Sequence, residues 1–205
     1  VHEHLRPGEP VGTRDLGEPL VPARRHAEPQ RRVGDGDLVH RVGAVGGALP
    51  VAFSTKSLYW NKDLYAQAGL DPEKAPATFA EEIAAAKAIK EKTGVAGIGI
   101  AGKDFDNSMH MFLDFMYSNG GTVIDTTTGE VKFDDVPARE TLQLYADLLP
   151  VMAEGATALE RGNLQALFED GKIGMYVTGP WGMGQHAAKK FLAGPIPHGP
   201  SGGSG

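Results

Sequence analysis

The stretch FSTKSLYWNKDLYAQAGLDPEKAPATFAE, residues 53–81, decides how the rest of this chain is interpreted. With the LPVA before it, it contains two short β-prone segments around a Ser-Thr-Lys turn. Asn61 follows the second segment and predicts the N-cap of a short helix that runs through Gln67 and ends at Gly69. The stretch therefore predicts a strand followed immediately by a helix.

Helix and strand patterns alternate downstream of this stretch. Thr78, with Glu81 three residues later, fits a capping box for a helix that runs to about Thr93. Residues 95–102, VAGIGIAG, are a candidate buried strand. Residues 107–118, NSMHMFLDFMYS, are apolar around most of a helix and are expected to lie inside the protein.

The second half of the chain continues the alternation. Residues 118–133 predict a turn and a small strand pair. Apolar side chains then recur at three- and four-residue spacing and predict a core-facing helix, with core positions Leu142, Tyr145, Leu149 and Met152. Asn163 is expected to cap a short helix through Glu169, residues 171–179 form another buried strand, and Pro180 suits the first position of a final helix. This order predicts an α/β layered fold with parallel or mixed strands.

Composition excludes several functional classes. The 205 residues include 41% hydrophobic and 22% charged residues and carry a net charge of -6, values typical of a soluble protein that does not bind nucleic acid. The absence of cysteine excludes disulfides, thiolate catalysis and cysteine-ligated zinc. No apolar run reaches the roughly 18 to 20 residues of a membrane span, and the amino terminus lacks the basic-then-apolar layout of a signal peptide.

Residues 1–48 differ from the rest of the chain. Seven of the nine arginines and none of the eleven lysines precede Lys56, and none of the fifteen aromatic residues lies before Phe53. Such a segment has few large apolar groups to offset the entropy of ordering it. We expect it to be disordered or translated out of frame from a GC-rich gene, with a natural Pro-rich linker as the alternative. Residues 49–190 then form the folded lobe, and residues 191–205 form a weakly ordered Pro/Gly-rich tail.

The opening stretch resembles the bacterial extracellular solute-binding proteins of family 1, which supply sugars to ATP-driven importers. The resemblance rests on LYWNKDL at 58–64 and AGLDP at 68–72. Two further stretches agree in type and order, MYSNGGTVID at 116–125 and ALFEDGKIGMYVTGPWGMGQ at 166–185. The similarity covers residues 49 to about 200.

This resemblance implies a periplasmic-binding-protein-like II lobe, the carboxy-terminal one of two, with part of the hinge. The parent protein would be a monomer that captures a sugar, an oligosaccharide or a related polyol between its lobes, uses no cofactor, and delivers the ligand to an ABC permease and its ATPase. It would work in the periplasm or at the cell surface, tethered there by a lipid-bearing cysteine that this chain lacks. The family's first lobe and last helices have no counterpart in the sequence, so a truncated form is expected. A carbohydrate-active enzyme fragment and a non-functional pseudogene product stay as alternatives.

The first candidate ligand-binding residues stand at predicted strand ends. The hydroxyls of Ser54 and Thr55 lie where the family's chain passes between lobes, with turn formation as the alternative. Gly179, Pro180 and Trp181 mark a strand-to-helix junction, where backbone amides are free to meet ligand oxygens. The Trp181 indole could stack on a sugar ring, although tryptophan is more often simply part of a core.

A second candidate group follows the predicted strand at 95–102. The side chains of Asp104, Asp106 and Asn107 suit polyol recognition at the carboxyl end of a strand, and the alternative is that one of them caps the next helix. For His110 we favour an internal, hydrogen-bonded position.

Two further pairs of residues carry structural expectations. Asn119 and Gly120 are expected to form a helix-ending turn with positive φ, with the Asn119 amide as a secondary candidate for the cleft. Tyr59 and Trp60 point to opposite faces of a strand, so at least one of them is expected in the core.

Two enzyme interpretations compete with a binding function. GIGIAG at 97–102 matches the three-glycine dinucleotide pattern, but the polar KDFDNS separates it from the next helix, whereas a nucleotide site needs the helix to begin inside the pattern. A glycosidase needs two carboxylates roughly 5 to 9.5 Å apart, and the nominal candidates are Asp104, Asp106, Asp125 and Glu130. The sequence contains no nucleophile elbow, metal-binding helix motif or phosphate loop.

Overall fold

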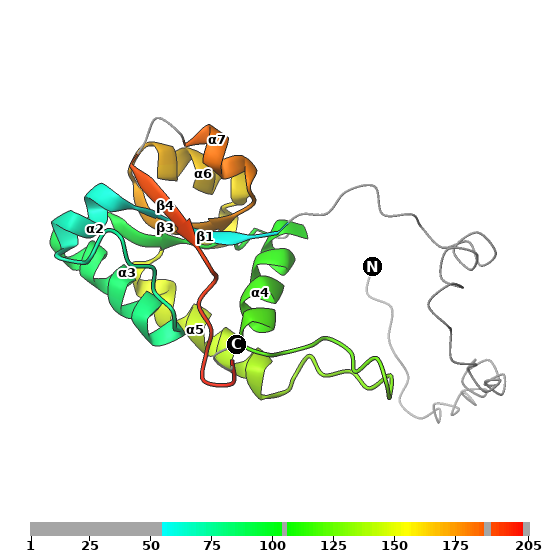
Figure 1. The fold of residues 1–205 in the computed structure, drawn as a ribbon. Helices are drawn as coiled ribbons and strands as arrows, with labels where there is room; N and C mark the ends of the chain where they lie inside the picture. The colour runs from blue at the N-terminus through cyan, green and yellow to red at the C-terminus, as the bar shows by residue number, and fades with distance from the viewer. Residues whose placement is uncertain (1–54, 104–105, 187–189, 203–205) are drawn as a thin grey trace, which may run out of the picture. The chain divides into compact units, whose positions relative to one another are not determined.

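A four-stranded mixed sheet organises the chain (Figure 1). The computed structural model describes residues 55–103, 106–186 and 190–202. The strand order is β2-β3-β1-β4, with β2 parallel to β3 and with β1 antiparallel to both β3 and β4. The strands are β1 (Ser57–Asn61), β2 (Ala96–Gly99), β3 (Ile173–Thr178) and β4 (Phe191–Gly194). This mixed sheet confirms the predicted α/β class, whereas the boundary predicted at residue 48 lies outside the described residues.

Helices cover both faces of this sheet. Figure 1 shows α6 and α7 on one side of the sheet and α2, α3 and α5 on the other. The α-helices are α2 (Lys62–Ala68), α3 (Phe79–Thr93), α4 (Asp106–Ser118), α5 (Val136–Leu148), α6 (Arg161–Glu169) and α7 (Trp181–Gln185). Two short 3-10 helices, η1 (Leu149–Val151) and η2 (Ala156–Ala158), connect α5 to α6.

Helix α3 packs directly on the backbone of β2 and β3. A Cβ at Gly97 would lie 2.1 Å from the carbonyl oxygen of Ala86, and one at Gly174 would lie 2.6 Å from Cδ1 of Ile89. Only glycine allows so close an approach of a helix to a sheet. Gly97 of β2 and Gly174 of β3 are thus explained by packing, and not by a nucleotide loop.

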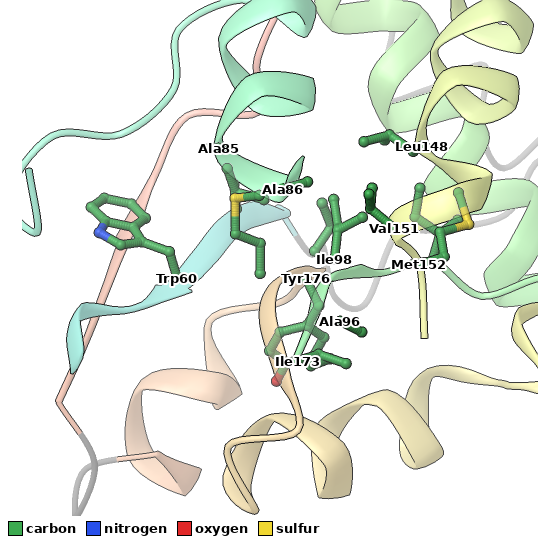
Figure 2. Packing of buried hydrophobic residues seen from close by; sticks show 14 of the residues in the cluster. Trp60, Ala85, Ala86, Ala96, Ile98, Leu148, Val151, Met152, Ile173 and Tyr176 are labelled. Carbon is green, nitrogen blue, oxygen red and sulfur yellow. The ribbon is translucent and has the colours of Figure 1, made fainter. Parts of the chain in front are cut away.

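An aromatic cluster fills the opposite face of the sheet. The Tyr176 ring lies 4.8 Å from the ring of Phe168 on α6, and its hydroxyl is hydrogen-bonded to Nε2 of the buried His186 at the end of α7. In Figure 2 the Tyr176 side chain extends towards these helices, while Ala85 and Ala86 lie on the α3 side. Tyr59 and Trp60 are both buried, which confirms the expectation for that pair.

Helices α2 and α3 begin and end at the capping residues that the sequence predicts. Asn61 Oδ1 accepts hydrogen bonds from two amides of the first turn of α2, and Gly69 ends that helix with φ 77°. Thr78 Oγ1 accepts from the amide of Glu81, and α3 ends at Gly94 with φ 74°. The Glu81 carboxylate accepts from the amide of Ala77, one residue before the cap, so it ties the entering chain to the helix.

Helix α5 presents a different face to the core from the one predicted. Its buried residues are Ala138, Thr141, Leu144 and Leu148. Leu142 and Leu149 are 60% and 59% exposed. Two apolar stripes run along this helix, and contacts with α3 and α4 select one of them. The predicted core positions were therefore wrong for these two leucines, whereas Met152 beyond the helix is buried.

Three other local predictions need correction. Helix α4 is not internal all round, because Met109 and Tyr117 are exposed on it. Residues 118–133 contain no strand pair, only an isolated bridge between Ile124 and Val131. The helix start signals also shift: Glu160 is the N-cap of α6 with Asn163 as its capping-box partner, and Pro180 is the N-cap of α7.

The Pro/Gly-rich tail, which was expected to be weakly ordered, is packed through residue 202. It supplies β4, which pairs with β1. Beyond β4, the His198 carbonyl oxygen accepts from the amide of Phe79 at 2.9 Å, and the His198 amide donates to the Ala77 carbonyl oxygen at 3.1 Å. Gly199 is buried against the Phe79 ring. These backbone hydrogen bonds hold a segment that has little side-chain bulk of its own.

Candidate functional site

Strand ends and helix starts meet along one edge of the sheet. Because β2 and β3 are parallel, their carboxyl ends share this edge, and the antiparallel β1 begins there, with Ser57 opposite Thr178. The segments that cross the edge are Thr55 and Lys56 before β1, Ile100–Gly102 after β2, and Gly179 after β3. Open α/β sheets bind ligands at such edges.

The indole of Trp181 lies flat on Gly179. A Cβ at Gly179 would come within 2.3 Å of Cη2 of the ring, so any larger residue would displace the indole. The Gly179 carbonyl oxygen accepts a buried hydrogen bond of 3.0 Å from the Tyr59 hydroxyl, which fixes this turn to the core. The indole is 39% exposed. One part of the ring is therefore held by the backbone and the rest is open to a ligand.

Two cations lie over the Trp181 ring. The Nζ of Lys56 lies 5.2 Å from the ring centroid, and Cζ of Arg161 lies 5.5 Å from it. Both distances are within the range of cation–π attraction. Arg161 is the first residue of α6, so a helix start brings this charge to the sheet edge.

The first two turns of α4 complete a small concavity beside these cations. Asn107, His110 and Asp114 recur at helical spacing and line it together with Lys56 and Arg161. Burial raises the pKa of Asp114, while nearby Lys56 and His110 oppose the shift. The Oδ2 atom of Asp114 is buried without a hydrogen-bond partner, in agreement with burial as the main cause of the raised pKa.

The structure brings some of the sequence-predicted candidates together. Thr55, Gly179 and Trp181 lie at the sheet edge, and Asn107 lines the concavity. Asp106 is exposed as the first residue of α4, and its Oδ1 accepts from the amide of Asn107 at 2.9 Å, so its carboxylate is engaged within its own helix. Two further candidates, Ser54 and Asp104, lie outside the described residues.

Two candidates are not at this edge. Gly120 has φ 77°, which confirms the predicted helix-ending turn. Asn119 is buried, and its Nδ2 donates to Glu140 Oε2 at 2.7 Å while its Oδ1 accepts from the amide of Gly202 at 2.8 Å. Its amide is thus used to fasten the tail to α5.

Sequence reasoning missed four of the site residues. His110 is exposed at the concavity and not internal as expected. Lys56, Asp114 and Arg161 were not singled out. A signal existed for Asp114, because it is a lone carboxylate within the apolar run MFLDFM, seven residues after Asn107. Arg161 had no local signal, since only the tertiary fold brings it to Trp181.

The described residues offer no alternative metal centre or membrane span. No group of three His, Asp or Glu side chains that could hold a metal ion occurs within residues 55–103, 106–186 and 190–202. None of the helices that the structure describes is long and apolar enough to cross a membrane.

Comparisons with known proteins identify the family of this chain. The family model described as bacterial extracellular solute-binding protein matches residues 27–204. A binding protein of Brucella abortus is 32% identical over 166 residues, which cover 77% of this chain and 39% of that protein. The chain belongs to the bacterial extracellular solute-binding proteins. The match begins within residues 1–48, the segment that composition sets apart.

Solved structures of solute-binding proteins share the fold. The GacH receptor of Streptomyces glaucescens, solved without ligand and with acarbose, is 28% identical with a TM-score of 0.62 and covers 73% of this chain and 39% of its own. Maltose-bound MalE3 of T. maritima is 28% identical with a TM-score of 0.65 and covers 72% of this chain and 39% of its own. This confirms the predicted lobe of the type II periplasmic-binding-protein fold. The chain spans 39% of the length of the curated relatives it matches.

Proposed function

We propose that this chain forms one wall of an interlobe cleft in the substrate-binding component of an ABC importer, and that this wall binds a sugar or an oligosaccharide. The observation that carries the proposal is the Trp181 indole, laid on Gly179 at the carboxyl edge of β3 with its remaining surface open. A sugar ring has an apolar face that matches an exposed indole. The structural neighbours named above were solved with acarbose and with maltose, which supports a carbohydrate ligand.

The polar groups around the indole suit the hydroxyls of such a ligand. Asn107 offers an amide donor and acceptor, Asp114 offers an acceptor, and Arg161 offers several donors. The family and its neighbours are binding proteins and not enzymes. Binding of this kind needs no cofactor. We keep Thr55 and Asp106 in the proposed site together with Ser54 and Asp104, the two candidates that lie outside the described residues, whereas Asn119 and Gly120 are left out of it.

The proposed protein is a monomer with three kinds of partner: the carbohydrate, a membrane permease and the ATPase that drives it. Transport would depend on hinge closure around the ligand, because closure is how two-lobed binders present a distinct form to their importer. The family is extracellular, and we propose a periplasmic or cell-surface location, with a lipid anchor as the tether of the complete protein. One wall alone supplies about half of the contacts, so the chain should bind its ligand weakly.

Tryptophan fluorescence tests the proposal directly, because the chain has two tryptophans in different environments. Trp60 is 3% exposed and donates through Nε1 to the Pro72 carbonyl oxygen, whereas Trp181 is 39% exposed. Titration of the chain with maltose and longer gluco-oligosaccharides should give a saturable change in emission. The change should persist in Trp60→Phe and disappear in Trp181→Phe. A change that persists in Trp181→Phe, or no change with any saccharide, would contradict the proposal.

A further inference from the structure

The guanidinium of Arg161 has no anionic partner among the residues that the structure describes. Its Nη1 donates a hydrogen bond to Gln165 Oε1 at 3.0 Å, and this acceptor is neutral. The two acidic residues nearest in the α6 sequence are engaged elsewhere: Glu160 pairs with Lys103 at 3.7 Å, and Glu169 Oε1 accepts a hydrogen bond from Nε2 of Gln165 at 3.1 Å. The half-buried guanidinium of Arg161, beside the proposed cleft, therefore still has N–H donors for a ligand.

Helix α6 holds this guanidinium in one orientation. Gln165, which accepts from Arg161, donates through Nε2 to Glu169 Oε1 at 3.1 Å, so three side chains form a row along one face of the helix. The capping box between Glu160 and Asn163 fixes the first turn that carries Arg161. An arginine that is already oriented loses less rotamer entropy when it binds a ligand.

The charges around the Trp181 indole favour an anion. Lys56 and Arg161 both lie within 5.5 Å of the ring centroid. Asp114 is the one carboxylate among the residues that line the adjacent concavity, which Arg161 also lines. A neutral ligand on this wall would meet the Arg161 donors with hydroxyl oxygens alone, whereas a carboxylate would meet the guanidinium fork in a stronger, charge-assisted bidentate pair.

We propose that the natural ligand is an acidic saccharide, with a uronate carboxylate bound by Arg161 while its sugar ring stacks on Trp181. This inference rests on the proposed function, since it names the class of carbohydrate for that same site. Arg161 then determines specificity: it selects uronates over the corresponding neutral sugars. Trp181 contributes to the binding of both kinds of sugar.

The test compares matched saccharides that differ only at one carbon. Galacturonate and its di- and trisaccharides are titrated against galactose and neutral galacto-oligosaccharides, with Trp181 emission and calorimetry as readouts. We expect uronates to bind at least about 10-fold more tightly than their neutral counterparts, because one charge-assisted pair between a carboxylate and a guanidinium accounts for an affinity difference of this size. Their affinity should also fall with added salt, because ions screen the pair. Galactose 6-phosphate, as a further arm, separates a carboxylate preference from a general preference for anions.

Variants of the two described arginines make the test specific. Arg161→Gln should remove the preference for uronates: uronate affinity should fall at least about 10-fold, whereas neutral affinity should fall by less, because the glutamine amide still donates to hydroxyls. Arg139→Gln is the matched control, because Arg139 lies on α5 in an exposed pair with Asp134 and should leave the preference intact. Arg161→Lys should retain only part of the preference, since it keeps the charge but loses the fork.

Several outcomes would overturn the inference. Neutral sugars that bind as tightly as uronates would leave the proposed function standing and refute the acidic ligand. Equal losses for both ligand classes in Arg161→Gln would show that Arg161 does not bind the carboxylate. Tighter binding of galactose 6-phosphate than of galacturonate would replace the uronate with a sugar phosphate. If no saccharide of any kind binds, the proposed function and the inference both fail.

Discussion

Asn107 and Asn119 lie at opposite ends of α4, about 18 Å apart along a helix that rises 1.5 Å per residue. Asn107 faces the concavity beside Trp181, whereas Asn119 is buried between α5 and the carboxy-terminal tail. Two residues of one type on one helix are therefore predicted to differ in role.

Substitution of these two asparagines separates binding from stability. Asn119→Ala leaves the Gly202 amide without its partner and removes one of the two hydrogen bonds to Glu140 Oε2, so the free energy of unfolding should fall by about 1–3 kcal/mol. Asn107→Ala removes only exposed hydrogen bonds and should change stability by less than about 0.5 kcal/mol. Urea unfolding measures both values. The saccharide response of Trp181 should weaken only in Asn107→Ala, and the reverse pattern would contradict the proposed site.

Gly179→Ala should disturb the position of the indole. The added methyl would overlap the Trp181 ring, so we expect destabilisation of about 1–3 kcal/mol and loss of the saccharide-induced change in fluorescence. Gly184→Ala is the control, because nothing lies within 4 Å of a Cβ there, and in helix α7 it should be neutral or slightly stabilising. Thermal unfolding and acrylamide quenching of Trp181 report the two effects. If the Trp181 indole keeps its position in Gly179→Ala, the indole does not depend on the absence of a side chain at residue 179.

Glu82 predicts an unusual dependence of stability on pH. It is fully buried on α3, neither carboxylate oxygen has a hydrogen-bond partner, and burial raises its pKa to about 8. The unfolded chain releases this proton near the ordinary value of 4.5, whereas the folded chain retains it. Stability should therefore be full below about pH 4.5 and fall as the pH rises towards 8, by about 1.4 kcal/mol per pH unit for one proton.

Urea unfolding at pH 5, 6, 7 and 8 measures this dependence. Glu82→Gln should flatten the decline, because the amide cannot ionise. Glu81→Gln is the neighbouring control: hydrogen bonding from the Ala77 amide lowers the pKa of the Glu81 carboxyl, so its contribution is lost only at acid pH. A wild-type profile that is flat or rises between pH 5 and 8 would show that Glu82 is not buried as an acid.

The buried face of α5 is open to a direct test. Leu144 is buried and Leu142 is 60% exposed on the same helix. Leu144→Ala should reduce the free energy of unfolding by about 2–5 kcal/mol, because it leaves a cavity. Leu142→Ala should change it by less than about 0.5 kcal/mol. Equal losses in the free energy of unfolding for the two variants would mean that both apolar stripes of α5 are buried.

The sequence predicted those features that depend on neighbouring residues. The caps at Asn61 and Thr78 and the helix ends at Gly69 and Gly94 follow from side chains and backbone conformations within a few positions of each other. The buried strands β2 and β3 were recognisable in the sequence, because a strand that is apolar at nearly every position must be covered on both faces of its sheet. The resemblance in residues 58–72 led to the family, which the comparisons then showed.

Other features depended on partners that are distant in the chain. The choice between the two apolar stripes of α5 was made by contacts with α3 and α4. The tail after β4 gained its order from backbone hydrogen bonds to the start of α3, which no composition rule anticipates.

By itself, the sequence determined the α/β class, the termini of α2 and α3 and the family, because capping, periodicity and motif similarity are short-range properties of the chain. Only the tertiary structure decided which charges surround Trp181. Lys56, Asp114 and Arg161 come from three separate segments, and they meet only because parallel β2 and β3 and antiparallel β1 share one edge of the sheet. Electrostatic interactions depend on distance in space, and the pairing of the strands sets that distance.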